Sequence, residues 1–162
     1  MRIGIISDTH NNLIGADDAV SILKSEKIDT VFHCGDVTSC EVIDLFKDFC
    51  VHLVWGNCDR DTIAIQFSIE LCIPGSSVGQ TYFDHIDSKS IAMVHGNDEG
   101  LLYKLIESGS YDYVFHGHTH SQRDEMIGKT HVINPGAIGG QFRKSFCILD
   151  TKTGETTFYN VE

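Results

Sequence analysis

Residues 2–10 read RIGIISDTH, in which the mostly β-branched apolar run Ile3 to Ser7 leads directly into Asp8 and His10. Two later segments have the same form, an apolar run followed by glycine and a polar residue: Thr30 to Cys34 before Gly35-Asp36, and Val51 to Trp55 before Gly56-Asn57. Near-continuous apolar runs are typical of parallel strands that are covered on both faces. The runs therefore predict neighbouring parallel strands whose ends carry polar side chains.

The segments between these runs have helical features. The apolar side chains that recur at the spacing of one helix face are Leu13, Ala16, Val20 and Leu23. Thr38 and Glu41 have the spacing of a capping box, which predicts a second helix from there to about Asp48. The residues from Asp61 to Gln80 are interpreted as a loop. The N-terminal part therefore reads βαβαβ, with strands joined by crossover helices.

The second half of the chain is predicted to be rich in strands. A hairpin is expected around Asp87-Ser88-Lys89, and a helix is expected to be capped by Asn97 and closed by Gly109. Further strands are expected at 111–115, 124–127, 130–133, 145–149 and 155–159. The pattern predicts an α/β fold with two packed sheets and helices outside.

Length, charge and cysteine content restrict the class of protein. A chain of 162 residues with 41% hydrophobic residues suits one packed domain. A net charge of −11 argues against binding of duplex nucleic acid. No stretch is long and apolar enough for a membrane span, and the N-terminus lacks the features of a secretory signal. We expect a cytoplasmic protein that does not bind membranes, with Cys34, Cys72 and Cys147 as buried thiols.

Five predicted strands end in side chains that bind metals. The seven candidate ligands are Asp8, His10, Asp36, Asn57, His95, His118 and His120. Ligands of α/β proteins bind at the carboxyl ends of strands, so we expect these residues to meet. A nitrogen and oxygen donor set without cysteine suits manganese, iron, zinc, cobalt or nickel rather than calcium. The set is too large for one tetrahedral ion, which predicts two ions that share a carboxylate.

The ordered motifs Asp8-x-His10, Gly35-Asp36, Gly56-Asn57, His95-Gly96 and Gly117-His118-x-His120 resemble those of the calcineurin-like metallophosphoesterases. The length and the Asn134-Pro135-Gly136 segment are similar to the small bacterial and archaeal phosphodiesterase branch. The resemblance implies a four-layer α/β/β/α sandwich, two mixed sheets flanked by helices, and one metallophosphoesterase domain over residues 1–162. It also implies the ligand assignment: Asp8, His10 and His120 on one ion, Asn57, His95 and His118 on the other, and Asp36 bridging both.

This donor set predicts hydrolysis of phosphate esters. Two cations can hold a shared hydroxide, aim it in line at phosphorus and neutralise charge on the phosphoryl oxygens. We therefore expect a metal-dependent phosphodiesterase that acts on small phosphodiesters or nucleotides. Manganese is the first expectation for the metal, with iron, zinc, nickel and cobalt as alternatives. The expected catalytic residues are Asp36, Asn57 and Asp59.

The chain departs from the family pattern at Cys58. Many relatives have histidine there, and that histidine is thought to protonate the leaving oxygen. A thiol is a weak hydrogen-bond donor with an ordinary pKa of about 8.5, so it is a poor substitute. We expect a preference for diesters whose leaving group needs little protonation. Asp59, which follows, either orients a ligand or caps the adjacent turn.

Other polar residues have a structural and a functional interpretation. Asn12 and Arg143 either contact substrate phosphate or serve as a helix N-cap and a solvated side chain, respectively. His33 and His116 are expected to be packed near the site. The histidines interpreted as structural are His52, His85 and His131.

The sequence also allows two alternative functions to be weighed against phosphoester hydrolysis. A non-catalytic, protein-binding scaffold of the same fold, as in the retromer subunit that resembles it, is the alternative; the complete ligand set argues against it. An amidohydrolase would need a barrel of about 250 residues, which is longer than this chain. A homo-oligomer is neither predicted nor excluded by the sequence.

Overall fold

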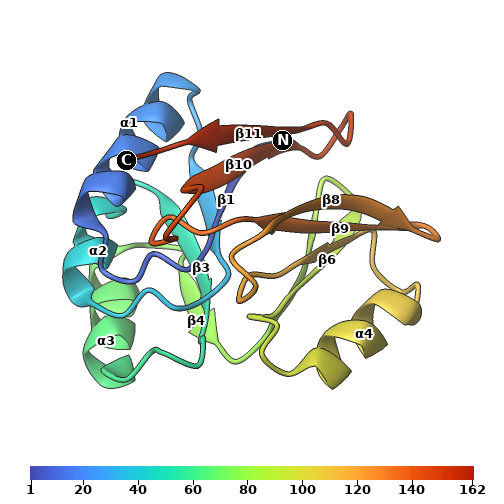
Figure 1. Cartoon of the computed structure of the whole chain (residues 1–162), viewed down its shortest axis with the longest axis horizontal. Coiled ribbons are helices and arrows are strands. Elements are labelled where there is room, and N and C mark those ends of the chain that lie inside the picture. The colour runs from blue at the N-terminus through green and yellow to red at the C-terminus, as the bar shows by residue number, and fades with distance from the viewer.

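The computed structural model describes the backbone of residues 1–162 and the side chains of residues 1–71 and 73–162. Two mixed sheets pack face to face, with helices on both outer faces (Figure 1). The predicted four-layer α/β/β/α sandwich is thereby confirmed. The prediction that Cys72 is buried lies outside the described side chains.

The first sheet has six strands and begins the chain. In spatial order its strands are β11 (Thr156–Asn160), β10 (Ser145–Asp150), β1 (Arg2–Ile6), β2 (Thr30–His33), β3 (Cys50–Val54) and β4 (Ser77–Gly79). The first four strands along the chain are parallel, whereas β10 and β11 are antiparallel to their neighbours. The helices that connect the parallel strands and stand at the left of Figure 1 are α1 (Leu13–Ser25), α2 (Cys40–Leu45) and α3 (Thr62–Cys72).

The second sheet has five strands. In spatial order they are β5 (Tyr82–Ile86), β6 (Lys89–Met93), β7 (Tyr113–Phe115), β9 (Thr130–Pro135) and β8 (Gln122–Ile127). The three central strands are parallel, and the two edge strands are antiparallel to them. Helix α4 (Glu99–Glu107) connects β6 to β7 and covers the outer face of this sheet (Figure 1).

Alternation along β1 shows how the layers are held together. Ile3 and Ile5 point into the apolar layer between the sheets, where Phe32 and Phe115 meet with ring centroids 5.6 Å apart. On the opposite face of β1, a Cβ on Gly4 would lie 2.6 Å from a methyl carbon of Leu23. Glycine therefore lets α1 lie close against β1, so the loop after the strand has a fixed course.

The prediction of a loop between Asp61 and Gln80 was wrong, because this segment contains α3 and β4. Ile65 and Ile69 are fully buried on one face of α3, but Ile63 and Phe67 are 84% and 65% exposed on the other. A helix that is apolar on both faces lacks the polar stripe by which an amphipathic helix is recognised. The sequence of α3 therefore lacks the alternation of apolar and polar residues that would have predicted a helix.

The predicted helix caps also need correction. Helix α2 begins at Cys40 after Ser39, which makes no side-chain cap bond, and it ends at Leu45. Thr38 lies one residue before the N-cap position, and its backbone N–H donates to the Asp59 carboxylate. In α4 the cap is Asp98 rather than Asn97; its Oδ1 accepts from the Leu101 N–H at 2.9 Å. Both shifts are local and leave the order of elements unchanged.

Cys34 and Cys147 are buried free thiols, as predicted. Burial raises the pKa of both well above the ordinary range. None of the helices in the described part of the chain combines the length and apolar character needed to cross a membrane.

Candidate metal centre

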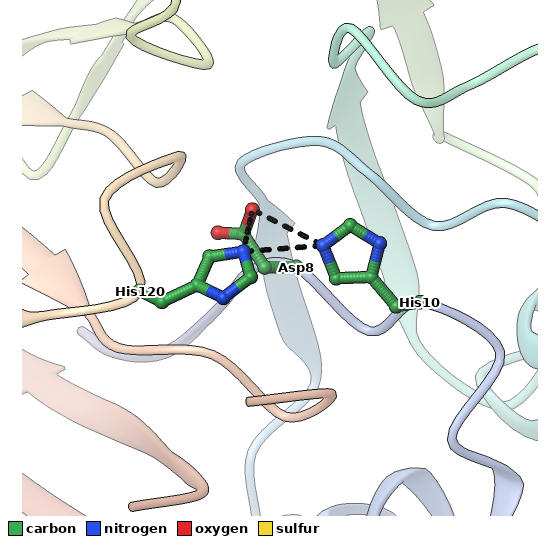
Figure 2. Close-up of side chains that lie close together, drawn as sticks. All are labelled: Asp8, His10 and His120. Atoms are coloured by element: carbon green, nitrogen blue, oxygen red, sulfur yellow. Dashed lines mark hydrogen bonds and ion pairs between the residues drawn. The ribbon is translucent and has the colours of Figure 1, made fainter. Parts of the chain in front are cut away.

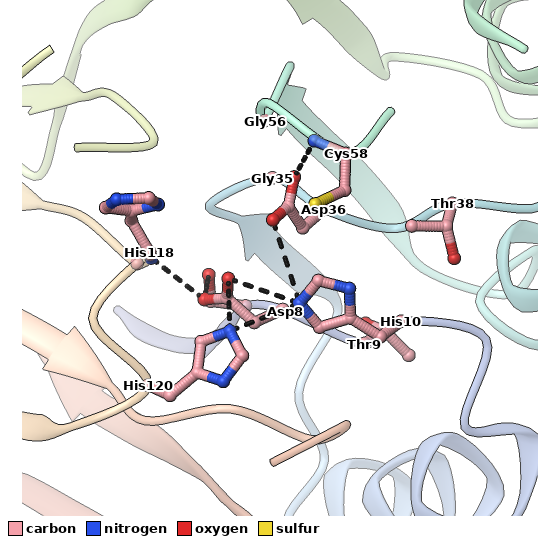
Figure 3. Close-up of polar contacts among 12 residues, drawn as sticks. Asp8, Thr9, His10, Gly35, Asp36, Thr38, Gly56, Cys58, His118 and His120 are labelled. Carbon is pink, nitrogen blue, oxygen red and sulfur yellow. Dashed lines mark hydrogen bonds and ion pairs between the residues drawn. The ribbon is translucent and has the colours of Figure 1, made fainter. Parts of the chain in front are cut away.

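The seven predicted ligands lie just beyond the carboxyl ends of β1, β2, β3, β6 and β7. Both sheets therefore contribute to the same edge of the sandwich, and the loops bring the side chains together. Figure 3 shows Asp8, His10, Asp36, His118 and His120. The convergence expected from the topology is observed. Their role as metal ligands stays a prediction. The surroundings of each side chain indicate whether it could hold a metal ion.

Asp8 is held by one of its two oxygens. The Ser7 hydroxyl donates to Oδ2 at 2.5 Å, and the backbone N–H of His118 donates to it at 3.0 Å. Oδ1 is buried without a hydrogen-bond partner. It lies 3.2 Å from His120 Nε2 and 3.8 Å from His10 Nε2 (Figure 2). An unpaired buried oxygen facing two imidazole nitrogens is the arrangement that a cation would satisfy.

The Asp36 carboxylate lies between two groups of imidazoles. Its Oδ1 accepts from the Cys58 N–H at 2.7 Å. Its Oδ2 is 3.4 Å from His95 Nε2. The same oxygen is 3.7 Å from His10 Nε2, a contact that Figure 3 shows. Burial opposes ionisation of Asp36, but the hydrogen bonds from His95 and Cys58 outweigh it, and the pKa of Asp36 is far below its ordinary value. Asp36 is therefore an ionised carboxylate that faces imidazoles on two sides.

His95 is oriented by its other ring nitrogen. Nδ1 is 2.7 Å from the Cys34 carbonyl oxygen, so Nδ1–H donates and Nε2 faces the site. Nε2 is 3.1 Å from Asn57 Oδ1, and the His118 ring stands edge-on to the His95 ring at 5.2 Å. Burial lowers the pKa of His95, but Asp36 and the Cys34 carbonyl outweigh it and the net shift is upward. The site thus attracts positive charge at this point.

The backbone at the ligands is held in a conformation that side chains rarely adopt. The ligands with positive φ are Asp8 (51°), His10 (44°), Asp36 (56°), His118 (66°) and His120 (55°). Such residues cost about 1–3 kcal/mol each and concentrate at functional sites. Asp and His tolerate this region better than most residues, which fits their use here.

Two glycines let the carboxylates contact neighbouring strand ends. A Cβ on Gly56 would lie 2.1 Å from Asp36 Oδ1, and a Cβ on Gly117 would lie 1.8 Å from Ser7 Oγ and 2.6 Å from Asp8 Oδ2. No larger residue fits at either position without displacing a carboxylate. The glycines of the motifs are therefore needed for close approach.

Asp59 binds backbone rather than the ligand side chains. Its Oδ2 accepts from the N–H groups of Asp36 at 3.0 Å and Gly56 at 2.8 Å, and its Oδ1 accepts from Thr38 at 2.8 Å. The carboxylate thereby ties the end of β2 to the end of β3. Of the two interpretations of Asp59, the contacts support orientation of a ligand, since Asp59 holds the turn that carries Asp36.

Ser7 and Asn134 position the site, and sequence reasoning missed the role of each. Asn134 Nδ2 donates to the Gly117 carbonyl at 2.8 Å and to Thr119 Oγ1 at 3.1 Å, which holds the loop bearing two ligands. Ser7 has no sequence signal beyond its place before Asp8. Asn134 had one, because it lies in the Asn-Pro-Gly segment that carried part of the resemblance.

The buried histidines outside the ligand set are neutral. Burial lowers the pKa of His33 to about 3 and that of His116 to about 4. His33 accepts from the Gly35 N–H at Nδ1, and its Nε2 is 2.7 Å from Thr9 Oγ1. Both residues pack near the site, as expected. His52 and His131 bond to Ser77 and Asp124, respectively, and belong to no metal-ligand group in the described residues.

Asn12, Arg143 and Cys58 differ in what they contact. Asn12 is the N-cap of α1 and donates to the carbonyl oxygens of Ile138 and Glu162, so the structural interpretation is correct. Arg143 is exposed but lines a cavity with His118 and His120. The Cys58 thiol faces Asp36 (Figure 3), and desolvation together with the nearby carboxylate raises the pKa of Cys58. The thiol is thus neither an acidic proton donor nor a preferred thiolate ligand.

Residues 1–154 match the model of the calcineurin-like phosphoesterase superfamily domain. Phosphodiesterase MJ0936 of Methanocaldococcus jannaschii is 33% identical over 159 residues, covering 96% of each chain. The solved structure of an archaeal phosphodiesterase, 32% identical, superposes with a TM-score of 0.94 over 99% of this chain and 100% of that one.

A zinc complex of Vps29 from Entamoeba histolytica shares the fold, with a TM-score of 0.72 at 21% identity over 99% of this chain and 91% of that one. The family model spans all five motifs, from Asp8 to His120, and the archaeal relatives match over nearly the whole chain. The chain therefore belongs to the calcineurin-like phosphoesterase superfamily.

Proposed function

We propose that this chain hydrolyses small phosphodiesters or nucleotides at a centre of two divalent ions. Metal-dependent phosphodiesterase activity follows from the family and from the phosphodiesterase relative. The two-ion centre is supported by the position of Asp36, whose Oδ2 lies within 3.7 Å of imidazoles from both halves of the ligand set. Asp8, His10 and His120 would hold one ion, Asn57, His95 and His118 the other, and Asp36 both.

The donor set fits divalent metals, because nitrogen and oxygen atoms converge around a buried oxygen that has no protein partner. Bound there, two ions would supply a water of lowered pKa as nucleophile and would offset charge on the phosphoryl oxygens. The residues around them provide the positioning. Ser7 and the His118 N–H fix Asp8, the Cys34 carbonyl fixes His95, and Asp59 fixes the turn of Asp36.

Among the proposed catalytic residues, Asp36 and Asn57 are direct ligands and Asp59 is a positioning residue. The raised pKa of Cys58 supports a weak proton donor near the leaving group. We therefore propose a preference for diesters with good leaving groups over esters whose leaving oxygen must be protonated. Manganese is the first expectation for the metal, and the mixed carboxylate, amide and imidazole donors also suit iron, zinc, nickel and cobalt.

The test is hydrolysis by the metal-depleted protein after addition of manganese. We expect activity on bis(p-nitrophenyl) phosphate that depends on metal, and loss of turnover in Asp36→Asn and His118→Ala. Asp61→Asn is the matched control, because Asp61 is exposed and makes no side-chain cap bond. A manganese-loaded protein without activity on any activated diester or monoester would contradict the proposal and favour the protein-binding scaffold.

Three further proposals concern the whole molecule. Residues 1–162 form one metallophosphoesterase domain, which the apolar layer shared by both sheets supports. A cytoplasmic location is supported by the free cysteines Cys34, Cys40, Cys50, Cys58 and Cys147. A small-molecule substrate rather than duplex nucleic acid is supported by the net charge of −11. Light scattering would test whether the chain forms a homo-oligomer, which the sequence neither predicts nor excludes.

A further inference from the structure

A cavity of about 340 Å³ adjoins the ligands His118 and His120. Phe142 and Arg143, from the loop between β9 and β10, line the same cavity. An adjoining cavity of about 430 Å³ is lined by His120, Phe142 and Arg143 as well. Sites for small molecules typically measure about 300–1,000 Å³. The two loop side chains therefore stand where a substrate held at the metal centre would extend.

The loop is fixed to the metal centre through its backbone. The Gly139 N–H donates to the Asp8 carbonyl at 2.8 Å, and the Ile138 N–H donates to the Ser7 carbonyl at 3.1 Å. A Cβ on Gly139 would lie 2.6 Å from the Thr9 carbonyl oxygen, so glycine is needed for this approach. Phe142, three residues further on, therefore starts from an anchored position beside the ligands.

The Phe142 ring is 99% exposed. Full burial of such a side chain is worth about 1.5–3 kcal/mol, which the ring does not gain in the free protein. An aromatic ring contributes about 1–3 kcal/mol per base when a planar nucleobase stacks on it. A nucleobase is thus the substrate group that best uses an exposed ring at the edge of a phosphate-binding centre.

Arg143 supplies the charge for the phosphate. Its guanidinium makes one long hydrogen bond, 3.4 Å from Nη1 to Gln122 Oε1. Among the side chains that the structure describes, no carboxylate forms an ion pair with it. In a chain of net charge −11, a guanidinium without such a partner beside the ligands is available for bidentate binding of phosphate oxygens.

We propose that this cavity is a nucleotide subsite, in which the nucleobase stacks on Phe142 and Arg143 binds phosphate. The inference rests on the proposed phosphodiesterase function and narrows its substrate to nucleoside phosphodiesters over aliphatic ones. The base-binding surface is a single exposed ring, so the subsite selects for a planar base and discriminates weakly among bases.

The test compares binding of AMP with binding of ribose 5-phosphate, which differ only by the base, to the manganese-loaded protein by calorimetry. Phe142→Ala is expected to weaken AMP about 5–150-fold, the equivalent of 1–3 kcal/mol, and to leave ribose 5-phosphate within about twofold. Phe142→Tyr keeps the stacking surface and should retain AMP affinity. Arg143→Gln should weaken both probes alike. Tyr103→Ala, an exposed aromatic on α4, is the control and should change neither.

The outcomes separate the two proposals when hydrolysis of bis(p-nitrophenyl) phosphate is measured on the same samples. Equal affinity for the two probes, no binding of AMP, or an AMP affinity unchanged by Phe142→Ala overturns the subsite even if the diester is hydrolysed. A protein that binds AMP through Phe142 but hydrolyses no phosphoester supports the subsite while the proposed catalysis fails. Because Phe142 is exposed, its variants should fold normally, as the melting temperature would verify.

Discussion

Replacement of Asp59 by alanine removes one carboxylate that accepts three backbone hydrogen bonds. Hydrogen bonds to charged groups contribute about 1.5–3 kcal/mol each, and the three bonds share one carboxylate, so their sum is less than additive. We expect Asp59→Ala to lower the free energy of unfolding by about 3–5 kcal/mol. That is a large part of the roughly 5–15 kcal/mol that stabilises a typical domain.

Asp59→Asn should lower the free energy of unfolding by less, about 1–2 kcal/mol, because the remaining amide oxygen still accepts hydrogen bonds. The cost that remains arises because the amide N–H faces a backbone N–H donor. The assay is urea unfolding of the metal-free protein, followed by circular dichroism. Asp61→Ala is the control, since Asp61 makes no side-chain cap bond, and should stay within about 0.5 kcal/mol of the parent. If Asp59→Ala lost no more stability than Asp61→Ala, Asp59 would not hold the strand ends together.

Three further perturbations follow from the same structure. Cys58→His should raise activity on diesters with poor leaving groups, measured against leaving-group pKa; an unchanged dependence would refute the missing-acid argument. Gly117→Ala places a Cβ 1.8 Å from Ser7 Oγ and should weaken manganese binding at least tenfold, by roughly 1.4 kcal/mol. The control Gly100→Ala, in α4, should leave manganese binding unchanged. Equal manganese affinities of the two variants would contradict the steric argument. His33, with a folded pKa of about 3 against about 6.5 unfolded, favours the folded state above pH 6.5, and this contribution is lost as pH falls toward 3. Between pH 7 and pH 5, the free energy of unfolding of the metal-free His33→Gln variant should therefore fall by about 2 kcal/mol less than that of the parent. Parallel pH curves for the two proteins would contradict this role of His33.

The strand ends could be predicted from sequence because two local signals coincide there. Each apolar run stops at glycine, aspartate or histidine, and the parallel topology brings such ends to one edge of the sheet. Asp8, Asp36 and His95 therefore lie together, although they are far apart in the chain. The resemblance to a family added the assignment of ligands to ions.

The rest depends on contacts that have no local pattern. Helix α3 is apolar on both faces and was interpreted as a loop. The bonds from Ser7 to Asp8 and from Asp59 to the turn of Asp36 depend on side-chain direction, which spacing alone does not encode. Asp and His tolerate the left-handed backbone found at the ligands, but their residue type alone does not predict it.

The most direct test of the two-ion centre is anomalous diffraction from crystals of the manganese-loaded protein. The arrangement of the seven side chains predicts two peaks that share the Asp36 carboxylate, one also contacting Asp8, His10 and His120 and the other contacting Asn57, His95 and His118. A single peak, or two peaks that do not share Asp36, would contradict it.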